Sequence, residues 1–191
     1  PAPDSAVYNP DALVPSTDGA PAAPDFCMKT PLSFLLAATL LAPTLIAYGT
    51  PEQRARFLPG IVNVTELWAQ GYSEPGAGSD LASLQTRCED AGDHWKINGS
   101  KLYITNAPIA DFMLVAARTE PELKPDAISL FIVELPNPGY RIVRDIGTMA
   151  AEGPLSHVLG GGHSEVEIKD LVVPAENLLG GEGNGFAMGQ H

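Results

Sequence analysis

Apolar residues are nearly continuous in one early stretch of the chain and recur at alternate positions in later ones. Residues 34–47 are mostly apolar. Thr30-Pro31 before them supplies an N-cap with a proline at the first helical position, and Gly49 after them supplies a stop. Pro43 lies inside this span and predicts a kink or a break. Because a membrane helix needs about 20 apolar residues, the stretch is interpreted as a buried core helix.

A second, shorter helix is expected directly afterwards. Thr50-Pro51-Glu52-Gln53 repeats the start signal, and Gln53 is placed for a capping box. Pro59 is expected to end this helix, because proline removes a backbone donor from a helix interior.

The later part of the chain shows the period of β-strands. Leu84, Thr86 and Cys88 alternate with polar residues. Residues 91–93 are typical of a turn, and residues 94–97 of the returning strand of a hairpin. Further strands are expected at 112–117, 128–133, 140–143, 166–168 and 171–173.

The fold class that these elements predict is α+β, with short N-terminal helices followed by an antiparallel β-barrel or sandwich. Residues 120–126 contain prolines and acidic residues and are expected to form a solvated loop. Residues 1–25 are rich in Pro, Ala and Asp and have no basic n-region, so they predict an extended or disordered tail and no targeting segment.

Composition argues against several classes of function. The formal net charge is −12 and the sequence pI is near 4.5, whereas nucleic-acid-binding domains need a basic stripe. The two cysteines, Cys27 and Cys88, give no disulfide framework and are typical of a reducing compartment. Neither they nor the histidines show metal-ligand spacing. An acidic chain can still bind an anionic cofactor, because backbone N–H groups supply the donors.

The glycine-rich segment 70–83 carries the main candidate chemistry. Gly76 and Gly78 allow the backbone to approach a ligand closely. Ser73 and Ser79 add hydroxyls, and successive N–H groups in such a loop can form a nest for a phosphate. The segment matches neither the Walker pattern nor the G-x-G-x-x-G fingerprint. From these residues alone, both a tight structural turn and a binding loop remain open.

Four ordered blocks of sequence resemble one family. Ser73-Glu74-Pro75-Gly76-Ala77-Gly78-Ser79-Asp80 is similar to the signature of the acyl-CoA dehydrogenase family of flavoenzymes. The other blocks are 99–107 with 110–111 and 115–119; 172–180 with Gly183 and 185–186; and, upstream, 41–44, 48–53 and 57–59. The resemblance runs from about residue 31 to residue 191, and four blocks in order are far more specific than one.

The resemblance implies an oxidoreductase that uses FAD to dehydrogenate an acyl-CoA thioester. A base removes the α proton, and the β hydrogen leaves as hydride to flavin N5. It further implies a role in lipid metabolism such as fatty acid β-oxidation. Electron-transfer flavoprotein or a similar acceptor is the implied partner.

The resemblance also assigns cofactor-binding positions, and it assigns no metal. They are Gln70, Gly71, Tyr72, Ser73, Gly78, Ser79, Tyr103, Ile104 and Thr105. Ser73 would meet the pyrimidine edge of the flavin, and Ser79 would lie where FAD and the acyl-CoA chain approach each other, so Ser79 is also a substrate-binding residue. Residues 103–105 would pack on the flavin ring with the Thr105 hydroxyl near N5. Without the family, Tyr103 and Ile104 are interpreted as core, and Thr105 as part of a strand-end turn.

The run 160–165, Gly-Gly-Gly-His-Ser-Glu, resembles a segment in one branch of the same family. By that resemblance, His163 is expected near the substrate or a subunit contact. A glycine hairpin with a solvent-facing histidine is the alternative. A metal pair of His163 and Glu165 is disfavoured, because no third ligand is nearby in the sequence.

The resemblance divides the chain into an extended tail (1–29), part of an N-terminal helical domain (30–66), a β-barrel middle domain (67–184) and the start of a C-terminal helix (185–191). In the family, a C-terminal helical domain provides the catalytic glutamate, and that domain is expected to be absent from this chain. No catalytic residue is therefore assigned. Glu74 and Glu152 do not match the family's position for the base.

Three hypotheses stand at this point. The chain is a fragment of an acyl-CoA dehydrogenase that is inactive alone, a non-catalytic or partner-dependent subunit of a related complex, or part of a related flavin oxidase or monooxygenase. An acyl-CoA substrate and a homo- or hetero-oligomer are expected, with no nucleic acid and no membrane span. The expected location is the cytoplasm in bacteria, or the mitochondrion or peroxisome in eukaryotes.

Overall fold

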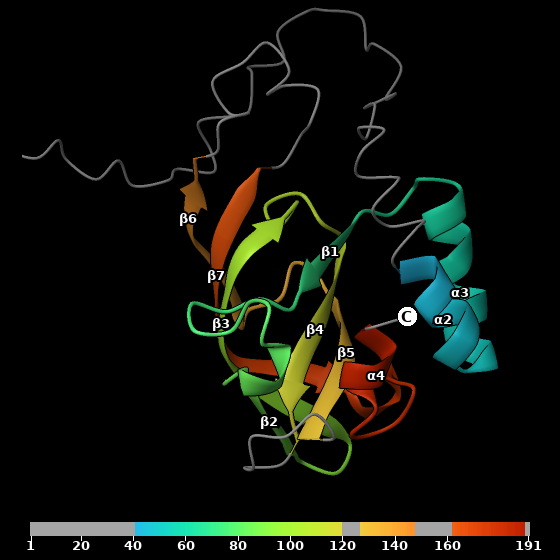
Figure 1. The fold of residues 1–191 in the computed structure, drawn as a ribbon. Helices are drawn as coiled ribbons and strands as arrows, with labels where there is room; N and C mark the ends of the chain where they lie inside the picture. The colour runs from blue at the N-terminus through green and yellow to red at the C-terminus, as the bar shows by residue number, and fades with distance from the viewer. Residues whose placement is uncertain (1–40, 120–126, 148–161, 190–191) are drawn as a thin grey trace, which may run out of the picture.

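The described part of the chain is mostly β-sheet with few helices (Figure 1). The computed structural model describes residues 41–119, 127–147 and 162–189. Within them the strands are β1 (Trp68–Gly71), β2 (Arg87–Asp90), β3 (His94–Thr105), β4 (Phe112–Arg118), β5 (Ile128–Glu134), β6 (Tyr140–Ile146), β7 (His163–Pro174) and β8 (Leu178–Leu179). The helices are α2 (Ala42–Tyr48), α3 (Pro51–Val62) and α4 (Gly185–Gly189), with 3-10 turns η3 (Leu81–Ser83) and η5 (Ala175–Asn177).

The strands form one mixed sheet that does not close into a barrel. Its order is β6-β7-β3-β2-β4-β5-β8, and β1 pairs with β4 off this path. The expectation of a mostly β domain is confirmed; of the barrel or sandwich that the strand spacing predicts, the barrel is wrong because the sheet does not close, and the sheet is mixed rather than antiparallel. Strand β1 runs parallel to β4, and β2 meets β4 in a parallel pair at Arg87 and Arg118. Parallel neighbours need a crossover connection, and the β2–β3 hairpin lies in the segment that joins β1 to β4.

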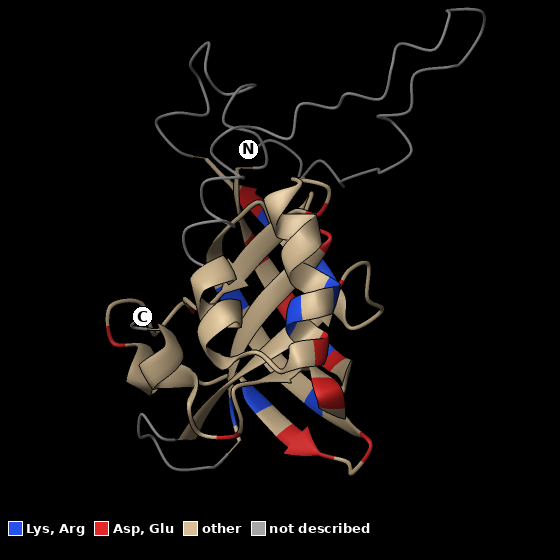
Figure 2. Ribbon diagram, turned by 90° about the vertical axis from the view of Figure 1, so that its right-hand side faces the viewer, with Lys and Arg blue, Asp and Glu red and all other residues tan. Residues whose placement is uncertain are grey.

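Two hydrophobic cores lie on opposite faces of strand β4. Leu114 and Ala116 belong to the first core, which α2 and α3 also enter. Met113 and Val115 belong to the second core, together with residues of β3 and β7. Because both faces are covered, every residue of β4 is buried. Strand β4 accordingly has a single charged residue, Arg118 at its end. In Figure 2 the helices lie in front of the sheet, on the side of the first core.

Three aromatic rings join helix α3 to the sheet. The Phe57 ring meets the Trp68 and Phe112 rings edge-on, at centroid distances of 5.5 and 5.4 Å. Trp68 and Phe112 stack on each other at 4.8 Å. This cluster fixes the helical layer on the side of the sheet where Figure 1 shows α2 and α3.

Helix α3 begins as expected but ends later than expected. The capping box is present: Thr50 Oγ1 accepts from the Gln53 N–H at 3.2 Å, and Gln53 Oε1 accepts from the Thr50 N–H at 3.0 Å. The helix continues through Pro59 to Val62, so the expected end before Pro59 is wrong. Ile61 is 1% exposed, and its burial in the core holds the last turn despite the backbone bond that Pro59 removes.

Pro43 and the β2–β3 hairpin lie within the described residues, whereas several other predicted segments do not. Pro43 lies in the first turn of α2, where a missing N–H is tolerated. The β2–β3 hairpin turns at residues 91–93, as expected. The N-terminal tail, the loop 120–126, Glu152 and residues 160–161 lie outside the described residues. No helix in the described ranges is long and apolar enough to cross a membrane.

Candidate functional site

The glycine-rich segment is attached to the end of strand β3. The carbonyl of Ser73 accepts from the Leu102 N–H at 2.9 Å. The carbonyl of Tyr72 accepts from Lys101 Nζ at 3.1 Å. Two segments that are about thirty positions apart in the sequence therefore lie side by side, and the contact comes directly before Tyr103.

A buried ion pair holds this attachment. Lys101 Nζ lies 2.9 Å from Glu74 Oε1, and the two side chains are 0% and 5% exposed. The Glu74 carboxylate also accepts from the backbone N–H groups of Gln85 and Thr86, at 2.5 and 2.9 Å. One carboxylate thus ties the beginning of the glycine-rich loop to β3 and to the segment that leaves the loop.

Both members of the pair have shifted pKa values. Burial would raise the pKa of Glu74, but the Lys101 ammonium and the hydrogen bonds that the carboxylate accepts hold that pKa below its ordinary value of 4.5. Burial lowers the pKa of Lys101 to about 8, and Glu74 opposes this shift. At pH 7 both groups are charged. Sequence reasoning missed the structural role of Glu74 and Lys101, although each is a charged residue within one of the four blocks that resemble the family.

Acid is expected to weaken this attachment. Because the folded pKa of Glu74 is lower than its ordinary value, the stabilisation is fully present above about pH 4.5 and is lost as pH falls through the folded pKa. Urea unfolding at a series of pH values should show this loss, and Glu74→Gln should remove that part of the acid dependence. An unchanged pH profile in Glu74→Gln would contradict the assignment.

The tip of the loop is open. A Cβ placed on Gly76 or Gly78 would meet no atom within 4 Å. Gly78 and Ser79 are exposed, and their backbone N–H groups make no hydrogen bond to the described residues. Free backbone donors beside open space are suited to an anionic group such as a phosphate.

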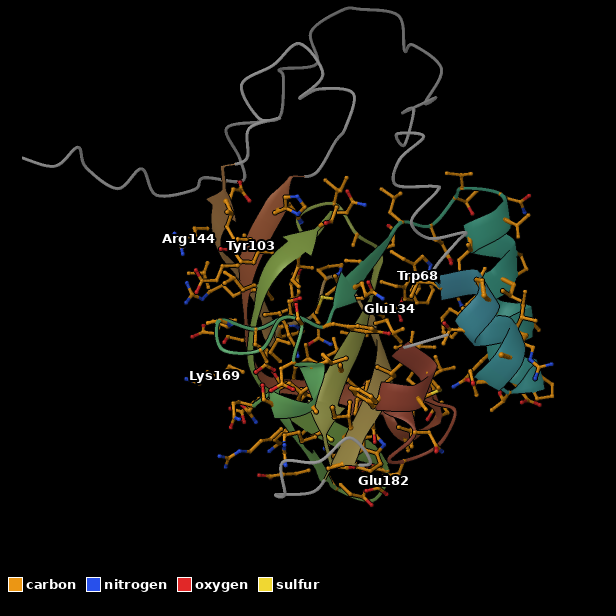
Figure 3. The ribbon with its side chains drawn as sticks, in the orientation of Figure 1. Trp68, Tyr103, Glu134, Arg144, Lys169 and Glu182 are labelled. Atoms are coloured by element: carbon orange, nitrogen blue, oxygen red, sulfur yellow. The ribbon has the colours of Figure 1, made fainter. Side chains whose placement is uncertain are left out.

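At the end of β3, the side chain of Ile104 is buried, with the exposed Tyr103 before it and the half-buried Thr105 after it. Tyr103 is 61% exposed and has a φ of 62°, and Figure 3 shows it on the outside of the sheet. Ile104 is 2% exposed and packs in the second core. Thr105 is half-buried. A β-bulge between Lys101 and Ile104 produces this arrangement, as bulges re-aim side chains.

Thr105 is paired with His163 across the sheet. The two residues are register partners on β3 and β7. Thr105 Oγ1 and His163 Nδ1 are 2.9 Å apart. The half-buried histidine is therefore not a purely solvent-facing side chain of a glycine hairpin. The carboxylate of Glu165 instead contacts Arg144 Nε at 2.6 Å.

The remaining sequence-assigned positions lie in or next to β1. Gln70 is half-buried, whereas Gly71 is buried and a Cβ there would approach Met113 Sδ to 3.0 Å. Tyr72 packs against the first core. Burial raises the pKa of the Tyr72 hydroxyl to about 12, although a hydrogen bond with the Gln70 side chain opposes the shift. The structure thus brings the backbone at Tyr72 and Ser73 to β3, but it places the Ile104 side chain in the core.

Neither a metal site nor the cavity beside α3 coincides with the assigned residues in the described part of the chain. No cluster of three or more His, Cys, Asp and Glu side chains that could hold a metal occurs in residues 41–119, 127–147 and 162–189. A cavity of about 490 Å³ lies between α3 and the η5–β8 segment and is lined by Gln53, Phe57 and Leu178 among others. It contains none of the residues assigned from the sequence.

The family model of the acyl-CoA dehydrogenase middle domain matches residues 69–160, which include the loop and the end of β3. The chain belongs to the acyl-CoA dehydrogenase family. The family expected from the four sequence blocks is therefore confirmed, and strands β2 to β6 of the sheet lie within the residues that the middle-domain model matches.

Relatives of known name support the same assignment. Acyl-CoA dehydrogenase IpdE1 of Mycobacterium tuberculosis is 44% identical over 149 residues, which cover 77% of this chain and 36% of that protein. Cyclohex-1-ene-1-carbonyl-CoA dehydrogenase of Geobacter metallireducens is 38% identical over 162 residues, 84% of this chain and 40% of the relative. In the solved ChsE4-ChsE5 complex from Mycobacterium tuberculosis, one chain matches with a TM-score of 0.71 and 35% identity, over 81% of this chain and 38% of that one. The chain therefore spans well under half the length of these three proteins.

Proposed function

We propose that this chain supplies the flavin-binding face of an FAD-dependent acyl-CoA dehydrogenase. The observation that carries the proposal is the attachment of the open glycine-rich loop to β3 just before the exposed Tyr103. Free N–H donors suited to phosphate and an exposed aromatic side chain suited to a planar ring thus belong to one joined unit.

The residues fit the cofactor through backbone donors, an aromatic ring and side-chain hydroxyls. The loop tip at Gly78 and Ser79 offers backbone donors to a pyrophosphate. The Tyr103 ring and the Thr105 hydroxyl offer an aromatic surface and a polar contact to the flavin ring, and Ser73 offers a hydroxyl to its edge. Ile104 would contribute backbone contacts only, since its side chain is buried. Bound FAD would supply hydride acceptance, and these residues would orient it.

The proposed reaction is α,β-dehydrogenation of an acyl-CoA thioester. It requires a base for the α proton, and Glu74 is unsuitable because its carboxylate is buried and ion-paired. We assign the base to a part of the family fold that these residues do not include. The printed name of the Geobacter metallireducens relative specifies a cyclic acyl group, so we leave the substrate class at acyl-CoA without restricting it to straight-chain fatty acids.

The proposed function includes an electron acceptor and assembly with other chains. An electron-transfer flavoprotein or a similar acceptor would reoxidise the flavin, and the chain would act in an oligomer. The similarity to a chain of the ChsE4-ChsE5 complex favours one alternative, a partner-dependent subunit whose site is completed by a second chain.

The deciding experiment is a flavin titration of the natural protein. Bound FAD would give absorbance bands at roughly 370 and 450 nm, and adding acyl-CoA under anaerobic conditions would bleach the longer-wavelength band. Bands with bleaching support the proposed dehydrogenase. Bands that appear only with a companion chain support the partner-dependent subunit, and no flavin in either case refutes the proposal.

Thr105→Val is expected to slow flavin reduction by about tenfold, because one polar contact to the reacting ring is lost while the shape is retained. Stopped-flow reduction by acyl-CoA measures the effect. Thr119→Val is the matched control, since its hydroxyl bonds the Ala127 carbonyl at the end of β4. Equal rates for wild type and Thr105→Val would remove Thr105 from the site.

A further inference from the structure

We propose that His163 is a positioning residue that donates its Nδ1–H to the Thr105 hydroxyl and leaves the hydroxyl proton free for a ligand acceptor. The inference rests on the proposed function for the identity of that ligand, the flavin. It goes further by assigning a role to a side chain on a different strand and a protonation state to a named atom.

The contact between the two side chains is built into the sheet. Thr105 and His163 are register partners, and their side-chain atoms meet at 2.9 Å. On the following residue, the Asn106 N–H donates to the Gly162 carbonyl at 3.2 Å and continues the pairing of the two chains. The backbone that carries His163 is therefore held against β3 by main-chain pairing, which places the ring opposite the Thr105 hydroxyl.

Ser164, which follows His163 on β7, bonds β7 to β6 directly beside the Thr105–His163 pair. Ser164 is fully buried, and its Oγ donates to Asp145 Oδ1 on β6 at 2.8 Å. Because the bulge in β3 lies between the Lys101–Val166 and Ile104–Ser164 pairs, Thr105 and His163 form the second pair beyond it. The bulge that exposes Tyr103 thus also sets Thr105 opposite the histidine.

The chemistry of a hydroxyl selects the direction of the hydrogen bond. A threonine hydroxyl has one proton and two acceptor lone pairs. If it donated to His163 Nδ1, no proton would remain for an acceptor on the flavin. If His163 donates from Nδ1, the hydroxyl accepts with one lone pair and is oriented with its proton free. Only the second arrangement satisfies both contacts.

The first test needs no flavin and no activity. In protein labelled with ¹⁵N and free of flavin, long-range ¹H–¹⁵N correlations report which imidazole nitrogen of a neutral histidine carries the proton. We expect the Nδ1–H form for His163 and a shift toward the Nε2–H form in Thr105→Val. A neutral His163 that carries its proton on Nε2 in the wild type would overturn the proposal.

The second test uses the flavin-loaded natural protein. His163→Ala is expected to slow flavin reduction about tenfold, with little change in KM or in FAD content, and to shift the flavin absorbance maximum. His163→Asn should recover part of the rate, because its amide can donate. His94→Ala is the matched control, since His94 lies at the opposite end of β3 and its ring bonds the exposed side chain of Asp93.

The outcomes separate the two proposals. Wild-type rates and spectra in His163→Ala would overturn the positioning role and leave the proposed function standing. Absence of bound flavin would refute the proposed function, and the labelling experiment would still decide the donor at Nδ1.

Discussion

Lys101→Met is expected to lower the free energy of unfolding by about 3–5 kcal/mol, because it leaves the Glu74 carboxylate buried without its partner. The two side chains are 0% and 5% exposed and lie 2.9 Å apart. Methionine preserves most of the length of the lysine side chain, so the lost charge rather than lost volume dominates. Urea unfolding of the purified chain at pH 7 measures the effect.

Two comparisons make this result specific to the buried pair. Arg141→Met breaks the exposed pair of Arg141 and Glu167, whose side chains are 64% and 45% exposed, and it should cost at most about 1 kcal/mol. The double replacement Glu74→Leu with Lys101→Met should recover only part of the loss, since it removes the unpaired buried charge but leaves the Gln85 and Thr86 N–H groups without their acceptor. Equal losses for Lys101→Met and Arg141→Met would contradict the role assigned to the pair.

The same substitution should also affect ligand binding. Lys101 bonds the Tyr72 carbonyl as well as Glu74, so its loss weakens the attachment of the glycine-rich loop to β3, where the bond from the Leu102 N–H to the Ser73 carbonyl remains. Under the proposed function, FAD affinity should fall in the double replacement even where stability is partly recovered, because apolar packing does not restore the hydrogen bond to the loop.

Phe57→Ala is expected to destabilise the fold by about 3–5 kcal/mol, since it removes the ring that joins helix α3 to Trp68 and Phe112. Phe57 is 6% exposed. Amide hydrogen exchange should show the loss first in α2 and α3, and thermal unfolding should show a lowered midpoint.

Val62→Ala provides the control on the same helix. Val62 is 66% exposed, so its truncation should change stability by no more than about 0.5 kcal/mol. If Phe57→Ala were equally mild, the aromatic cluster would not be what holds the helical layer to the sheet.

Local sequence pattern was sufficient for most strands but not for how they pair. The alternation at Leu84, Thr86 and Cys88 is matched by burial of all three side chains. The parallel pairing of β1 with β4 has no comparable local signal, because β1 has only four residues and its partner lies more than forty positions away. The open, mixed sheet therefore could not be distinguished from a closed antiparallel barrel.

The candidate site was predictable as a set of segments and less so as a set of contacts. The sequence blocks identified the loop and the end of β3. They did not reveal that Glu74 and Lys101 form the ion pair joining them, because this contact is 27 positions apart. The burial of Ile104 beside an exposed Tyr103 depends on a bulge in the pairing with β7, and strand periodicity carries no sign of such an irregularity.

An open sheet also has ends, and among the strands of residues 41–119, 127–147 and 162–189 one end is β6. Unpaired strand edges can template the addition of further strands from other molecules. On β6, Arg141 and Arg144 are paired with Glu167 and Glu165 of β7, so this border carries rows of opposite charge that an incoming apolar strand would have to desolvate. The fold can thus leave its sheet open at β6 while these charges act as gatekeepers against edge-to-edge aggregation.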